Sequence, residues 1–155
     1  MSAKALLASA RKTGGMPDEV TFRQEFMRGI AVNTFETCAI CPELPRVFPS
    51  STPDRNERGR MVFFVGAMDR WGLEVLVDGQ DSQDYTSGFA PGGRYAALEV
   101  DDYAVLDLRR NANGTIPAAV TLKEKVITVF FKLGDFSRCQ CVLGMNKTRR
   151  DIDLS

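Results

Sequence analysis

The second half of the chain alternates between hydrophobic and polar residues, which is the pattern of strands buried on one face. Residues 60–68 and 72–77 predict two strands joined by a short turn. Residues 95–100 and 103–109 predict a β-hairpin, because Asp101-Asp102 occupies the two positions of a tight turn. The alternation therefore indicates a domain in which consecutive strands pair with one another.

Two further segments, residues 125–133 and 138–143, alternate in the same way. Six or more short strands separated by turn residues are typical of an antiparallel β-sandwich, jelly-roll-like in form, or of a β-barrel. We expect residues 60–143 to form this mainly β fold. The predicted core residues are Val62, Phe64, Leu98, Leu106, Ile127, Val129 and Phe131.

The first half of the chain has a different pattern, with one segment of helical spacing. Residues 17–29 begin with a proline and two acidic residues and end with a glycine, which are helix start and stop signals. Phe22, Phe26 and Ile30 follow one another at intervals of four, as on one face of a helix. A strand that includes Val20 is the alternative interpretation.

These patterns divide the chain into three parts. Residues 1–16 predict a polar, helical or irregular arm, residues 17–146 a single β-rich globular domain, and residues 147–155 a polar C-terminal tail. The arm is rich in alanine and serine, carries three basic residues and ends in glycines, so we expect it to be too polar for the core and its deletion to leave the domain folded. Two long connections, 42–59 and 78–93, exceed the usual length of loops in compact domains, and such loops are often functional.

Composition narrows the function classes. Hydrophobic residues make up 44% of the 155-residue chain, and 20 basic residues balance 20 acidic residues. The chain contains no histidine, which excludes Ser-His-Asp and Cys-His catalysis and every metal site built on imidazole. No apolar run approaches the roughly 20 residues that span a bilayer, so we expect no membrane partner.

The four cysteines are the residues that most resemble a metal site. Cys38 and Cys41 form a C-x-x-C pair, and Cys139 and Cys141 form a C-x-C pair. Four thiolates can bind structural zinc, but the second pair alternates with the strand and resembles small buried hydrophobic residues. We therefore expect free buried thiols, with no metal, no disulfide and no cofactor.

Carboxylates provide the other candidate chemistry. Asp78, Asp81 and Asp84 lie in one loop, but their spacing of three does not match a calcium-binding EF-hand. Glu99 or Asp107 could form a catalytic carboxylate pair with one of these loop aspartates, although alternation predicts that Glu99 and Asp107 point outward. The sequence therefore predicts no catalytic residue, and we expect the protein not to be an enzyme.

Charge is segregated along the chain. Residues 69–107 contain nine acidic and two basic residues, a net charge of −7, and residues 108–150 contain nine basic and two acidic residues, a net charge of +7. If the two regions occupy different faces, they favour contacts between subunits; if neighbouring strands interleave them, the charges cancel. The predicted interface residues are Lys4, Arg11, Lys12, Asp78, Asp81, Asp84, Arg149 and Arg150.

Two functions fit these observations. The first is a non-enzymatic structural protein that forms homo-oligomers or a larger assembly, as a small virion coat protein or capsid-cement protein. The alternative is a single-stranded nucleic-acid-binding module on an OB-like barrel, which needs cations beside stacking aromatics. Its candidate residues are Trp71, Tyr95, Tyr103, Lys123, Lys125, Phe130, Phe131, Lys132 and Arg138.

The expected location follows from the function. A coat or cement protein would lie in the virion, and a chain with no secretory signal is otherwise expected to be intracellular. Residues 1–15 carry basic residues and no acidic ones, which also fits a mitochondrial transit peptide.

Overall fold

The structure is a computed structural model that describes most of the chain. The described residues are 1–34, 39–42, 61–66, 70–78, 86–93, 95–111, 113, 115–117, 123–144 and 148–154. Among them, residues 19, 39, 41, 42 and 61–64 are described by their backbone only.

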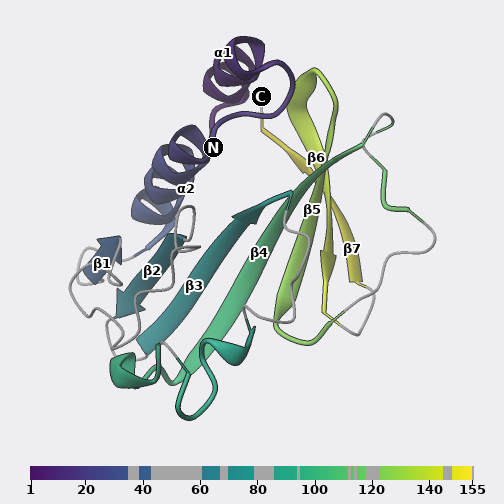
Figure 1. Ribbon diagram of the computed structural model, residues 1–155. Coiled ribbons are helices and arrows are strands. Elements are labelled where there is room, and N and C mark those ends of the chain that lie inside the picture. Colours follow the sequence, from purple (N-terminus) through teal and green to yellow (C-terminus); the bar gives the residue numbers. More distant parts are fainter. Residues whose placement is uncertain are drawn as a thin grey trace.

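Two helices precede a seven-stranded sheet whose strands lie in the order in which they occur in the chain. The elements are α1 (Ala3–Thr13), α2 (Glu19–Asn33), β1 (Ala39–Pro42), β2 (Met61–Gly66), β3 (Arg70–Val77), the 3₁₀ helix η2 (Ala96–Leu98), β4 (Asp102–Asn111), β5 (Val126–Lys132), β6 (Asp135–Leu143) and β7 (Thr148–Asp153). The sheet is curled into a half-barrel, and both helices lie along the same side of it (Figure 1). The prediction of a mainly β fold is confirmed.

The sheet is mixed, so the prediction of an antiparallel fold is wrong at its centre. β3 pairs with β4, and β4 with β5, in parallel, whereas β1–β2, β2–β3, β5–β6 and β6–β7 are antiparallel. The described strands form this one sheet, and no second sheet packs on it to make a sandwich.

In place of the predicted hairpin around Asp101, hydrogen bonds join the beginnings of strands β3 and β4. The Arg70 amide donates to the Asp101 carboxylate at 2.8 Å, and the Asp101 amide donates to the Arg70 carbonyl at 2.8 Å. The Arg70 guanidinium also holds this carboxylate at 3.1 Å and lowers the pKa of Asp101. Because these bonds join the first residue of β3 to the residue preceding β4, the two strands run in the same direction. The segment before Asp101 forms η2 instead of a strand.

The other strand predictions are confirmed. β2 and β3 form the expected antiparallel pair, β5 falls within the predicted segment 125–133, and β6 contains the predicted segment 138–143 but begins three residues earlier. The side chains of Val62 and Phe64 in β2 lie outside the described part of the structure. The predicted tail, residues 147–155, contains strand β7.

The main core lies between the helices and one face of the sheet. Leu6 and Phe22 of the helices are fully buried against sheet residues. The Phe131 ring centroid lies 5.7 Å from that of Phe22 and 5.5 Å from that of Phe136. This aromatic cluster joins α2 to β5 and β6, so the helices are part of the folded domain.

The predicted core is mostly confirmed within the described residues. Val129 and Phe131 are buried, while Leu106 and Ile127 are partly buried and pack against the same core. Leu98 is only partly buried, because it belongs to η2 and not to a strand.

The N-terminal segment enters the core, so the expectation that it is too polar to do so is wrong. Helix α1 begins with a Ser2 cap and ends at Gly14, whose φ of 79° is the left-handed conformation that glycine adopts readily. Leu6, Ser9 and Ala10 are buried, and the helix contacts β6. These three small or apolar residues form the buried face that packs on the domain, while the basic residues of the helix stay exposed.

The second helix is confirmed, but it is longer than predicted. Asp18 caps α2, because its carboxylate accepts the Thr21 amide at 2.7 Å and the Ser9 hydroxyl at 2.5 Å. The helix continues past Gly29 to Asn33. Gly29 therefore does not end the helix, and a Cβ atom there would make an ordinary contact with the backbone nitrogen of Met1, 3.7 Å away.

Candidate functional site

Two buried carboxylates lie on the face of the sheet opposite the helices. Glu74 and Asp107 are 0% and 1% exposed, and they come from the neighbouring strands β3 and β4. The register places Glu74 beside Val105, two residues before Asp107, so the two side chains occupy diagonal positions on one face. The expectation that Asp107 points outward is wrong, whereas Glu99 is exposed.

Each carboxylate has its own partner. The Tyr95 hydroxyl donates to Glu74 at 3.2 Å, and the Arg109 guanidinium forms a two-pronged ion pair with Asp107 at 2.6 and 2.7 Å. A buried carboxylate must be hydrogen-bonded or paired to remain in a low-dielectric interior. Both Arg109 nitrogens contact one oxygen of Asp107, Oδ2, and the other oxygen, Oδ1, is buried with no hydrogen-bond partner among the described residues. The ion pair and the hydrogen bond therefore offset part of the cost of burying the two acids.

Aromatic side chains cover this face near Glu74. Phe89 stacks on Tyr103 at 4.6 Å and contacts Tyr95 at 4.8 Å. A Cβ atom at Gly72 would lie 2.4 Å from the Phe89 ring, so only glycine at this position of β3 allows Phe89 to approach the sheet. Phe89 and Tyr95 thereby hold residues 86–93 and 95–99 over strands β3 and β4.

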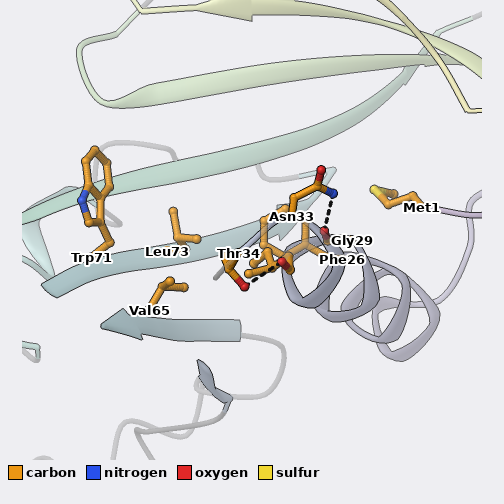
Figure 2. A pocket seen from close by; sticks show the side chains of 9 residues that line it. Met1, Phe26, Gly29, Asn33, Thr34, Val65, Trp71 and Leu73 are labelled. Carbon is orange, nitrogen blue, oxygen red and sulfur yellow. Dashed lines mark hydrogen bonds between the residues drawn. The ribbon is translucent and has the colours of Figure 1, made fainter. Parts of the chain in front are cut away.

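An apolar groove opens on the helix side, between the end of α2 and strands β2 and β3. Its volume is about 490 Å³. Figure 2 shows Val65, Leu73 and Trp71 on the sheet side of the groove, with Phe26 and Thr34 on the helix side. Trp71 is 40% exposed. Residues 35–38 and 67–69, which adjoin the groove in sequence, lie outside the described part of the structure, so only these walls of the groove are known.

A second, polar depression of about 590 Å³ lies beside the last two strands. Asp135, Asp151 and Asp153 line it together with Lys132 and Arg138. The charges nearly balance, and no group of three metal-ligating side chains is present in the described residues. The depression therefore lacks the excess of one charge that favours an ionic ligand.

Strand β7 forms one edge of the sheet and is exposed along its whole length. It pairs with β6 on one side only. Arg149 and Arg150 are exposed, and neither makes an ion pair within the described chain. An unpaired strand edge offers a row of backbone donors and acceptors to another chain.

The cysteines that the structure describes lie on two different strands. Cys38 lies outside the described residues, Cys41 is in β1, and Cys139 and Cys141 are in β6. Four strands separate β1 from β6 in the order of the sheet. Cys139 and Cys141 are buried free thiols, and the hydrogen bond to Cys141, together with burial, raises the pKa of Cys139.

The structure brings some of the segregated charges together inside one subunit. Asp78 pairs with Arg110 at 3.1 Å, and Lys125 pairs with Asp102 at 2.6 Å and lowers the pKa of Asp102. Both pairs join the acidic region to the basic region, because the parallel strands place them side by side. Neighbouring strands therefore interleave these charges, as the second interpretation of the pattern expected.

The predicted interface residues that the structure describes lie in three separate parts of the chain. Lys4, Arg11 and Lys12 are exposed on α1, far along the chain from Arg149 and Arg150 on β7. Asp78 is occupied by its ion pair, and residues 81 and 84 lie outside the described part. The residues on β7 are the ones that lie on an unpaired backbone edge.

The aromatic platform of the nucleic-acid alternative does not form from the predicted residues. Phe130, Phe131 and Tyr95 are buried, and Tyr103 stacks on Phe89. Trp71 is exposed, but it faces the apolar groove. Stacking of bases requires exposed rings, which these buried side chains do not provide.

Sequence reasoning did not single out Glu74 or Arg109, and it named Tyr95 only as a possible base-stacking residue. A signal for Glu74 was present, because it lies within the nearly continuous apolar run of residues 72–77. Such runs are typical of central parallel strands buried on both faces, so an acidic residue within one is expected to be buried and to bind a partner side chain.

Comparisons with models of known protein families, with curated proteins and with solved structures found no match. Among the described residues, no helix has the length and apolarity needed to cross a membrane. The inference of function therefore depends on the geometry of this chain alone.

Proposed function

We propose that this protein is a non-enzymatic structural protein that assembles with further copies of itself or with a larger protein shell. In its most concrete form it is a small virion coat protein or capsid-cement protein, which would lie in the virion. The observation that supports this proposal best is strand β7, a six-residue strand that is exposed at the edge of the sheet. The outer backbone edge of β7 has no partner among the described strands, and its four charged side chains, Arg149, Arg150, Asp151 and Asp153, favour a partner strand of complementary charge over other strands.

The buried chemistry of the domain also supports a structural role. The carboxylate of Asp107 is held by Arg109, and that of Glu74 accepts the hydroxyl of Tyr95. Groups that act as acids or bases need access to a substrate, and these two carboxylates are buried on the face of the sheet opposite the helices. The proposal does not require the jelly-roll sandwich expected from the sequence, since strand edges of a single sheet can also join subunits.

The test is self-association of the full chain. Light scattering behind a sizing column, over a range of protein concentrations, should show a species larger than the monomer whose fraction grows with concentration. High salt should slow its formation more than it dissolves the finished assembly, because charges steer encounter while apolar burial supplies most of the affinity. A protein that remains monomeric up to about 1 mM gains less than roughly 4 kcal/mol on association, and that result would refute self-assembly.

A further inference from the structure

We propose that strand β7 pairs antiparallel with β7 of a second copy, about a two-fold axis through Asp151. This inference rests on the proposed assembly function and names the surface that would carry it. The resulting dimer would contain one continuous sheet of two seven-stranded halves.

The backbone of β7 is set for this pairing. The Leu154 amide donates to the Ser137 carbonyl at 2.7 Å, so even-numbered residues of the strand bond inward to β6. In an antiparallel pair, hydrogen-bonded and non-hydrogen-bonded positions alternate. The amides and carbonyls of Arg149, Asp151 and Asp153 therefore point away from the sheet. Pairing about Asp151 joins these three residues to Asp153, Asp151 and Arg149 of the second copy, with two backbone bonds in each pair.

The side chains of β7 favour the antiparallel arrangement. Positive charge lies at the start of the strand and negative charge at its end, so reversal of a second copy sets Arg149 opposite Asp153 twice. Arg149 has no ion pair within the described chain, and Asp153 is 3.8 Å from Arg138. Asp151 would lie opposite Asp151 of the second copy. Its carboxylate accepts a hydrogen bond from the Gln140 amide at 2.7 Å and would lie diagonal to Arg149 of the second copy.

Apolar contact would accompany the backbone bonds. The same register places Ile152, which is 40% exposed, opposite the Arg150 side chain of the second copy. The methylene groups of an arginine can cover apolar surface while its charged end stays in water. Both Ile152–Arg150 pairs would lie on one face of the joined sheet.

Other arrangements of this edge are less favourable. A parallel pairing in register would set Arg149 beside Arg149, and like charges directly opposite one another destabilise a sheet. The other edge, β1, has four residues and ends in Pro42, which has no amide to donate. A second β7 is therefore the partner that this edge fits best.

Disulfide trapping in the full chain tests the register. In a hydrogen-bonded antiparallel pair the Cα atoms lie about 5.5 Å apart, within the roughly 4.4–6.8 Å that a disulfide spans. Asp151→Cys should therefore give a cross-linked dimer under mild oxidation. Thr148→Cys is the matched control on the same exposed strand, because six residues of offset separate the two copies of position 148 by about 20 Å. The wild type, with its four native cysteines, sets the background.

A charge exchange tests the same pairing without new cysteines. Arg149→Asp should weaken self-association about tenfold, because both Arg149–Asp153 pairs become repulsive. Arg149→Asp combined with Asp153→Arg should restore most of the affinity. Circular dichroism checks that each variant is folded, which is expected because both side chains are exposed.

The outcomes separate the two proposals. Strong cross-linking of Asp151→Cys over Thr148→Cys, with rescue by the double charge exchange, supports β7 pairing. If light scattering shows an oligomer but Asp151→Cys cross-links no more than Thr148→Cys, the β7 pairing is refuted and assembly uses another surface. A chain that is monomeric at every concentration refutes both the β7 pairing and self-assembly.

Discussion

Replacement of Leu6 by alanine tests whether helix α1 belongs to the core or is an arm. Leu6 is 0% exposed and belongs to the core cluster that contains Phe22 and Phe131. The substitution removes three buried carbon atoms, which are worth about 0.8 kcal/mol each in transfer from water. The cavity left behind adds to this loss. We therefore expect the free energy of unfolding to fall by about 3 kcal/mol.

Urea unfolding at a fixed protein concentration measures this change. The chain has one tryptophan, Trp71, whose fluorescence reports on the groove between α2 and the sheet, while circular dichroism reports on the helices and strands. In thermal unfolding, about 3 kcal/mol corresponds to a decrease in Tm of roughly 6–12 °C for a chain of this size.

Lys4→Ala is the matched control, since Lys4 is exposed on the same helix. It should change stability by no more than about 0.5 kcal/mol. Deletion of residues 1–15 should destabilise the domain more than Leu6→Ala, because it also removes the buried Ala10. Equal stability of Leu6→Ala and Lys4→Ala would show that α1 does not pack on the sheet as described.

Three further predictions follow from other contacts. Asp18→Ala should remove the α2 cap and lower the free energy of unfolding by about 1 kcal/mol. Because its hydrogen bonds lower the pKa of Asp18, this contribution is present above about pH 4 and is lost as the pH falls through the folded-state pKa. Asp18→Asn should therefore weaken the acid dependence of stability in urea titrations. Arg109→Ala should destabilise the domain by about 3 kcal/mol, because it leaves the Asp107 carboxylate buried without its partner. Adding Asp107→Asn should recover part of this loss of stability. No recovery would mean that the guanidinium acts through packing alone. Protein purified without chelator should contain no stoichiometric zinc by elemental analysis, and one equivalent per chain that disappears in Cys139→Ser would contradict the separation of the cysteines.

The existence of most strands could be predicted from the sequence, because alternation is a local property of each segment. β5, with Val129 and Phe131 on its core face, lies where its pattern predicts. The same holds for α2, whose Phe22 is buried as its helical spacing predicts.

Strand direction could not be predicted in this way. The turn signal at Asp101-Asp102 is compatible with a hairpin, but the partner of Asp101 is Arg70, which lies 31 residues earlier in the chain. Only that long-range contact fixes the parallel start of β4. Short-range turn preferences carry no information about it.

The buried acids were missed for a related reason. Polarity alone predicts that Asp107 points to solvent, and its burial depends on Arg109, two residues along the same strand face. The segregation of charge along the chain was also a poor guide to surfaces, because parallel pairing sets Asp102 close to Lys125 within one subunit.

The contact between α1 and β6 also determines when this chain can complete its fold during synthesis. Each strand pairs with its neighbours in the sequence, so the sheet can grow as the chain emerges. Leu6, in contrast, shares its core with Cys139 and Cys141, which are made more than 130 residues later. The part of the α1 face that packs on β6 therefore stays uncovered on the ribosome until β6 has been translated. A chain that stops before β6 carries an unburied surface that chaperones and proteases recognise.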